Sequence, residues 1–509
     1  MVETERHWVP DIASRFRNDE QNQSFHRRKH HSIHERQRFR NVNCEGDLLK
    51  AIATTAGQAR RRAAFVATLA ALAGLMFGLD VGVISGAQQF IQHEFGVNDV
   101  VLERIVSSMM VGAAIGAALA AWLSVHFGRK RSLVFSASLF VIGSLISAAA
   151  WSPDALVGAR LVLGLAIGIA AFTAPLYLAE IAPPDRRGAM ISTYQLMITI
   201  GIFVAFLSDT GFSYIEGWRW MLGIIALPGA LFLLGVLGLP ESPRWLVLRQ
   251  REVDAGAVLQ KLRGDPALVL KEVAEIREQL RTPQQGWRLF LENRNFRRSV
   301  GLGIALQVVQ QLTGINVVMY YAPRIFADMG YATSMQMWFT AIVGLTNVLA
   351  TFIAIGLVDR IGRKPILYAG FVVMGIGLGV VGWLMHLGMG TQDERLLAVA
   401  MLLVFVVGFA FSAGPLVWTL CSEIQPLKGR DFGIGVSTVT NWVFTAIVGA
   451  TFLTLLNRFG HANTFWLYAA FNVAFLLFTW ALVPETRGVT LEQIEGKLMG
   501  GKRLRDIGA

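Results

Sequence analysis

Residues 357–365 read LVDRIGRKP, a short basic loop that follows a long apolar run. Its Gly-Arg-Lys triplet starts at Gly362. The same triplet starts at Gly128, also after an apolar run, which gives an offset of 234 residues (362 − 128). A motif that returns after about half a chain length indicates internal duplication if other motifs return in the same order.

Two further motif pairs keep that order. Glu180 and Arg187 bracket one loop as Glu423 and Arg430 bracket another, at an offset of 243 (423 − 180). Pro-Glu-Ser starts at position 240 and Pro-Glu-Thr at position 484, at an offset of 244 (484 − 240). Three pairs at nearly one offset predict that the chain consists of two related halves.

The composition excludes a set of soluble domains. Hydrophobic residues make up 54% of the 509 residues and charged residues 16%, whereas a soluble chain carries roughly 25% charge. Apolar runs of about 20 residues recur, each long enough to cross a ~30 Å hydrocarbon core. They are expected at 63–92, 105–126, 132–151, 155–180, 190–210, 219–239, 299–327, 335–358, 365–388, 396–422, 431–457 and 463–483. The predicted fold is an all-α membrane protein with twelve transmembrane helices in two six-helix halves.

The net charge of +11 (46 Lys and Arg minus 35 Asp and Glu) indicates membrane topology rather than nucleic-acid binding. The basic residues concentrate in alternate loops, and the loops between them are poor in Lys and Arg. Because Lys and Arg in short loops set orientation, both termini and the basic loops are predicted to face the cytoplasm.

Five segments are expected along the chain. They are an N-terminal cytoplasmic tail (1–60), the N-terminal six-helix half (61–240), a cytoplasmic helical insert (241–298), the C-terminal six-helix half (299–484) and a C-terminal cytoplasmic tail (485–509). The first tail has no apolar run of the kind that a secretory signal peptide needs, and its five histidines lack a spacing typical of a metal site. Cys44 and Cys421 lie on segments that do not pair, so no disulfide or metal centre is expected.

Asp80 is a lone carboxylate in the apolar stretch FGLDVGVISG (77–86), where an ionisable side chain is functional by default. Arg160 is the other charged residue of the first half that has strongly apolar neighbours in the sequence. At ~1.5 Å per residue, Asp80 lies roughly 25 Å above the inner boundary and Arg160 roughly 10 Å below the outer one. The two are predicted to pair, either as a static structural contact or as a proton-coupling site.

Six charged residues lie at the predicted cytoplasmic helix ends. Opposite charges there can latch the two halves together, or the basic members can serve only as positive-inside anchors. The six are Arg129, Glu180, Arg187, Arg363, Glu423 and Arg430.

Polar residues inside the apolar runs are suited to a ligand that presents hydroxyl groups and one apolar face. Amides both donate and accept hydrogen bonds, and an aromatic plate such as Trp418 covers an apolar face. A single transmembrane amide can equally be a bond between helices. The amides are Gln195, Gln310, Gln311, Asn316, Asn347 and Asn441.

At its motifs the chain resembles the major facilitator superfamily, and within it the sugar porter family. The motifs are GRK (128–130), PLYLAEIAPPDRRG (175–188), PESPRW (240–245), QQLTGINVVMYYAP (310–323), LVDRIGRKP (357–365), GPLVWTLCSEIQPLKGRDFG (414–433) and PETRG (484–488). The resemblance covers about residues 60–505. Residues 344–360 and 412–418 are most similar to family members that carry galactose with a proton, and members that carry arabinose with a proton come next.

The resemblance implies roles for particular residues. Asp80 matches a position that marks proton-coupled members, and the charged residues at the cytoplasmic helix ends match the family's gate motifs. The six amides and Trp418 match sugar-contacting positions. Phe77 matches an aromatic lining position and Tyr320 a polar lid near the site.

The function that follows is import of a monosaccharide with a proton by alternating access. The expected partners are the sugar, the proton and the lipid bilayer, and a monomer in the bacterial inner membrane is expected. No enzyme activity, nucleic-acid binding, metal or cofactor is expected. The expected coupling ion is the proton. An arabinose–proton symporter, a facilitative uniporter, an efflux pump and a non-transporting sugar sensor are the alternatives, and the sequence leaves the monosaccharide open.

Overall fold

The structure is a computed structural model and describes residues 57–58, 61–182, 187–281 and 286–508. Most of the expected N-terminal tail, residues 1–56, lies outside the described part. The described part contains twelve helices that are long and apolar enough to cross a membrane, which confirms the predicted fold class.

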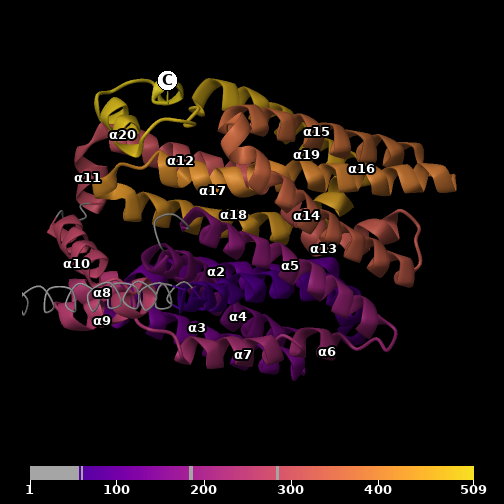
Figure 1. The fold of residues 1–509 in the computed structure, drawn as a ribbon. Helices are drawn as coiled ribbons and strands as arrows, with labels where there is room; N and C mark the ends of the chain where they lie inside the picture. The colour runs from indigo at the N-terminus through magenta and orange to yellow at the C-terminus, as the bar shows by residue number, and fades with distance from the viewer. Residues whose placement is uncertain (1–56, 59–60, 183–186, 282–285, 509) are drawn as a thin grey trace, which may run out of the picture.

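The first half contains six of these spans (Figure 1). They are Arg61–Phe95, α2 (Asp99–Phe127), α3 (Arg129–Ala148), α4 (Pro153–Ile181), α5 (Arg187–Ser213) and the pair α6 (Trp218–Gly223) and α7 (Ala226–Leu237). Polar N-cap residues specify where some of these helices begin. Asn98 accepts the backbone N–H of Val101 at the start of α2, and Ser152 accepts that of Ala155 at the start of α4.

The second half repeats the plan. Its spans are α12 (Arg294–Leu312) with α13 (Ile315–Asp328), α14 (Thr333–Ile361), α15 (Arg363–Leu387), α16 (Gln392–Phe411) with α17 (Ala413–Glu423), the short η1 (Leu427–Gly429) with α18 (Arg430–Phe459), and α19 (His461–Leu482). The break between α12 and α13 falls at Gly314, whose φ of 93° is one that other L residues rarely adopt.

Between the halves lies a small helical insert of α8 (Pro243–Leu248), α9 (Glu252–Arg263), α10 (Pro266–Arg281) and α11 (Gly286–Glu292). It has its own core around Trp245 and Ala255. The insert lies at the same end of the molecule as α20 (Leu491–Met499), η2 (Leu504–Asp506) and the C-terminus (Figure 1). We call this the insert end and the other the opposite end.

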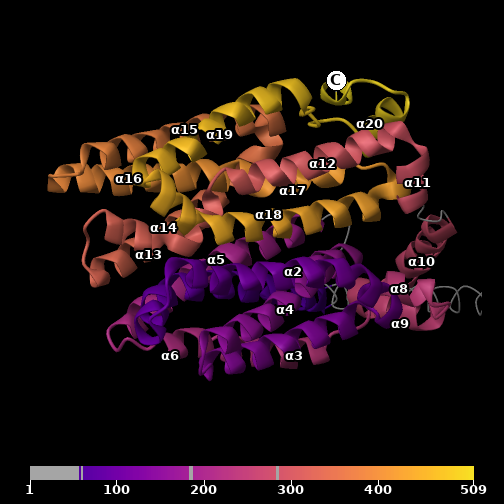
Figure 2. The same cartoon turned by 180° about the vertical axis from the view of Figure 1, so that it is seen from behind.

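The two halves lie side by side, the indigo-to-magenta half against the orange-to-yellow half (Figures 1 and 2). Helix α2 packs against α18, and α5 packs against α14. Large apolar side chains point away from the protein core, for example Leu234 and Leu477, which are 66% and 68% exposed. In water such faces would be unexplained apolar patches, whereas in a bilayer they contact lipid.

Small residues allow the close helix packing. A β-carbon on Gly78 would overlap the backbone of Ile198 on α5, and one on Gly164 of α4 would overlap the backbone of Met109 on α2. Glycine at such positions lets neighbouring membrane helices approach closely.

Candidate transport site

Asp80 and Arg160 form an ion pair with 2.8 Å between Asp80 Oδ1 and Arg160 Nη1, and both side chains are fully buried. The pair connects the Arg61–Phe95 helix to α4, as the depth argument predicted. In the described part, Asp80 Oδ2 and the Nε and Nη2 atoms of Arg160 have no hydrogen-bond partner. The pair is therefore held by a single bond, although each side chain has capacity for more.

Gln310 is fully engaged within its own half. Its Nε2 donates to the backbone oxygens of Ala413 (2.9 Å) and Gly414 (3.1 Å) at the start of α17. Its Oε1 accepts from Nδ2 of Asn441 on α18 at 2.9 Å. Asn441 also donates to Gln307, at 2.7 Å. Gln310 and Asn441 thus connect α12, α17 and α18, which is the helix-bonding alternative for these amides.

Gln311 and Asn316 lie on either side of the α12–α13 break. The Asn316 amide nitrogen donates to the Gln311 amide oxygen. Within the described part this bond leaves the nitrogen of Gln311 and the oxygen of Asn316 for a ligand. Gln311 is 4% exposed and Asn316 is half-buried. A donor and an acceptor side by side at a helix break match the alternating pattern of sugar hydroxyl groups.

The other predicted sugar-site residues are more scattered. Phe77 contacts Trp442 across the halves, with ring centroids 5.2 Å apart. The backbone oxygen of the buried Tyr320 accepts a hydrogen bond from the side-chain amide of Gln88, also across the halves. Asn347 is buried on α14, Gln195 is half-buried on α5, and Trp418 is 38% exposed on α17.

In this structure, charged residues of the predicted latch form ion pairs that brace each half. Arg129 at the start of α3 pairs with Glu180 near the end of α4 at 2.8 Å. In the second half, Arg363 pairs with Glu423 at 3.0 Å. These ion pairs form inside a half because each Arg starts the helix that packs beside the one carrying its Glu.

Of the two remaining members of that set, only the Arg430 side chain is described. Arg430 donates to the backbone oxygen of Gln425 in its own half, at 3.4 Å. The side chain of Arg187 lies outside the described residues. A latch across the halves is therefore not the arrangement that the described contacts of these residues form.

Sequence reasoning missed how the Pro-Glu-Ser and Pro-Glu-Thr motifs act. Glu241 accepts the backbone N–H groups of Arg129 (2.9 Å) and Lys130 (3.1 Å) at the start of α3. Glu485 accepts those of Arg363 (3.0 Å) and Lys364 (2.9 Å) at the start of α15. A carboxylate at a helix N-terminus satisfies free N–H groups and complements the helix dipole. The duplication thus extends to individual hydrogen bonds.

The same motifs supply a hydroxyl to each brace. Ser242 donates to Glu180, and Thr486 donates to Glu423. Gly128 and Gly362 directly precede α3 and α15. Their φ values of 95° and 107° turn the chain sharply between two helices.

Side-chain bonds that cross between the halves gather at the opposite end. Glu103 on α2 is buried and accepts both the backbone N–H (2.8 Å) and the hydroxyl (2.7 Å) of Thr454 on α18. Asn457 donates to Asp99 at 2.9 Å. These residues were not predicted, although carboxylates beside apolar runs were the available signal.

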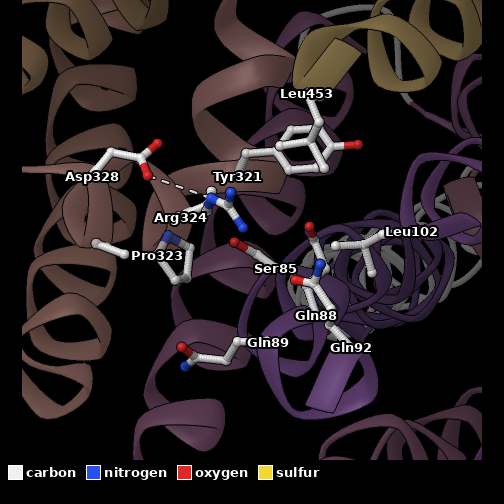
Figure 3. Close-up of a pocket in the computed structure, with 11 residues that line it drawn as sticks. Ser85, Gln88, Gln89, Gln92, Leu102, Tyr321, Pro323, Arg324, Asp328 and Leu453 are labelled. Carbon is white, nitrogen blue, oxygen red and sulfur yellow. Dashed lines mark ion pairs between the residues drawn. The ribbon is translucent and has the colours of Figure 1, made fainter. Parts of the chain in front are cut away.

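A cavity of about 230 Å³, lined by polar and apolar side chains, lies between the halves near these bonds (Figure 3). Ser85, Gln88 and Gln92 line it from the Arg61–Phe95 helix, and Tyr321 and Arg324 line it from α13. Ser85 is five residues beyond Asp80, which is about 7.5 Å along a helix. The cavity therefore lies beyond Asp80 along this helix, toward the opposite end.

Comparison with known proteins identifies the family. A sequence model of the family described as sugar (and other) transporter matches residues 66–498. The chain belongs to this family. It is 62% identical over 446 residues to the galactose-proton symporter of Escherichia coli (strain K12), covering 87% of this chain and 96% of that protein.

Further relatives agree. The chain is 55% identical over 453 residues to the arabinose-proton symporter of Escherichia coli (strain K12), covering 88% of this chain and 96% of that protein. Among solved structures, a partially occluded inward open conformation of the xylose transporter XylE from E. coli matches with a TM-score of 0.75 and 29% identity. That match covers 84% of this chain and 99% of the XylE chain.

Proposed function

We propose that the chain imports a monosaccharide, with galactose as the first candidate, together with a proton by alternating access across the bacterial inner membrane. The buried Asp80–Arg160 pair carries this proposal, because it places an ionisable group inside a sugar transporter whose similar relatives are proton symporters. The proton is the coupling ion, and the chain is a transporter rather than an enzyme. Both halves of the transport path lie in one chain, which supports a working monomer.

Protonation of Asp80 is the coupling step. The ionised carboxylate holds Arg160 through one 2.8 Å bond. A proton on Asp80 removes its charge, and the guanidinium then turns to other acceptors. The relative free energies of the outward-facing and inward-facing conformations change with it. The proton thus acts as a ligand that binds one conformation better than the other, as any coupled transition requires.

The conformation described here supports an inward-facing assignment. Bonds between the halves, including Glu103 to Thr454, close the opposite end. The insert end carries the basic loops, so we assign it to the cytoplasm. The sugar then reaches Gln311 and Asn316 near the middle of the molecule, where broken helices line binding sites in transporters of this kind.

The driving force is sufficient for accumulation. One charge that moves across 100 mV contributes ~2.3 kcal/mol. At ~1.4 kcal/mol per factor of ten, this supports accumulation of sugar on the order of 50-fold.

Uptake by proteoliposomes tests the proposal. With an imposed membrane potential, labelled galactose should accumulate inside, and addition of galactose should make the external medium more alkaline. Unlabelled galactose should compete more strongly than arabinose, glucose or xylose. Equilibration without accumulation would instead establish a facilitative uniporter, and stronger competition by arabinose would move the assignment to that sugar.

A further inference from the structure

Asp209 is a second buried carboxylate, on α5, and it has no role in the mechanism above. It is 1% exposed. Its Oδ2 accepts the backbone N–H of Gly86 at 3.2 Å, and its Oδ1 is buried without a hydrogen-bond partner in the described part of the chain. Asp209 therefore differs from Asp80, whose charge is balanced by Arg160.

Among the described side chains, the helices around α5 bring no cation to Asp209. On α4, Arg160 bonds Asp80, and on α6, Arg219 bonds Glu94 at 2.6 Å. The titratable or charged residues of the packed elements are Arg61, Arg62, Asp80, His93 and Glu94 on the first helix, Asp154, Arg160, Tyr177 and Glu180 on α4, Arg219 on α6, and Arg360 on α14; the side chain of Asp359 on α14 lies outside the described residues. Within the described residues, none of these forms a hydrogen bond or ion pair with Asp209.

The surroundings favour the neutral acid. Burial of an unpaired carboxylate costs several kcal/mol, even after the protein relaxes around it. One N–H bond from Gly86 offsets only part of that cost. A β-carbon at Gly86 would overlap the Asp209 side chain, so the two helices pack closely at the carboxyl group.

Asp209 lies beside a contact that must open during transport. The next residue, Thr210, donates its hydroxyl to the backbone oxygen of Met337 on α14, in the other half, at 3.3 Å. One turn earlier, Phe206 packs against Gly344 of the same helix. If the halves separate at the opposite end, this contact parts and water reaches the surroundings of Asp209, where a carboxylate is stable.

We propose that Asp209 is a second proton-binding site, which takes a proton from the opposite side of the membrane when the halves close there and returns it to that side when they reopen. The inference rests on the proposed alternating-access function. The proton is bound and released on one side, so it is not transported and the coupling through Asp80 is unchanged. The consequence is that acid outside favours closure of the outer end.

The expected pH dependence follows from the binding of one proton. Closure that takes up one proton becomes less favourable by up to about tenfold for each unit that the external pH rises above the pKa of the hydrated carboxyl group. Asp209→Asn, which mimics the neutral acid in size, should close equally well at every pH.

The test is exchange of labelled for unlabelled galactose by proteoliposomes at several external pH values, in an Asp80→Asn background that removes the coupling proton. Exchange by Asp80→Asn should slow severalfold per unit as the external pH rises. Exchange by the double variant Asp80→Asn/Asp209→Asn should be independent of pH, and faster than Asp80→Asn at alkaline pH. Asp209→Ala serves as a second neutral variant if the Asn protein does not insert.

Thr210→Val is the matched control. It removes the neighbouring hydroxyl bond to Met337, so it should change the rate at all pH values alike and keep the pH dependence. An unaltered pH dependence in both neutral Asp209 variants would overturn the second proton site. Accumulation of galactose by Asp80→Asn would instead contradict the proposed coupling, whatever Asp209 does. Asp209→Asn alone should still accumulate galactose, with a weaker dependence on external pH.

Discussion

Gln310 and Gln311 are adjacent in sequence and have opposite roles in the structure. Gln310 uses its amide to connect α17 and α18 to α12. Within the described part of the chain, the side-chain amide of Gln311 bonds only Asn316, across the helix break. Both were predicted as sugar contacts, and the hydrogen bonds now rank Gln311 first.

Substitution of each glutamine separates the two roles. Gln311→Ala should weaken galactose binding by about tenfold or more, because loss of one hydrogen-bonding partner costs on the order of 1–3 kcal/mol, and should leave the Tm of the purified protein nearly unchanged. Gln310→Ala should lower the Tm as well, since it leaves the backbone oxygens of Ala413 and Gly414 without their side-chain donor and removes one of the two acceptors of Asn441. Binding calorimetry and thermal unfolding measure the two effects. Unchanged galactose binding in Gln311→Ala would return Gln311 to a packing role.

Single residues also show where sequence reasoning stops. Asp80 and Arg160 were found because each is flanked by apolar residues, and hydrophobic depth sufficed to predict their pairing. Asp209 carries the same signal but falls at the edge of the expected run 190–210, where a charge reads as a loop residue. The helix continues to Ser213, so Asp209 is inside it.

At the level of elements, the number and order of the spans followed from hydrophobic runs, whereas the helix breaks did not. An average over about 20 residues is insensitive to a one-residue break such as Gly314, and glycine is common in this chain, at 51 residues. The capping by Glu241 and Glu485 was also hidden, because each carboxylate is more than 100 positions from the helix start that it caps.

Substitution of Glu485 tests how much its cap at the start of α15 contributes to stability. Glu485→Ala leaves the first N–H groups of α15 without their acceptor, and the loss of a helix cap costs about 0.5–2 kcal/mol. The Tm should therefore fall relative to the parent protein. Glu492→Ala is the control, because Glu492 is an exposed residue in the first turn of α20. Equal Tm values for the two variants would show that Glu485 contributes nothing as a cap.

At the level of the whole molecule, the relation between the halves was the least predictable feature. Charged residues at helix ends indicate that ion pairs and hydrogen bonds can form there. The conformation of the transporter decides whether they form within a half or across the halves. In this structure Arg129 and Arg363 brace their own halves, and Glu103 bonds across. Sequence spacing is the same in every conformation, so it cannot distinguish these cases.

The orientation that the basic loops predict is directly measurable. A reporter that is active only in the cytoplasm should be active when fused after residue 509 or inserted within 264–265, the turn between α9 and α10. A reporter in the turn between α15 and α16, at 388–391, is the matched opposite-end control and should be inactive. The reverse pattern would invert the proposed direction of opening.

In the proposed mechanism, Asp80 couples the proton to the sugar. Asp80→Asn preserves the size of the protonated side chain but cannot release a proton. In proteoliposomes it should bind galactose and exchange labelled for unlabelled galactose, yet fail to concentrate galactose against a gradient or to make the external medium alkaline. Accumulation by Asp80→Asn equal to that of the parent protein would contradict this account and leave Asp80 as a structural partner of Arg160.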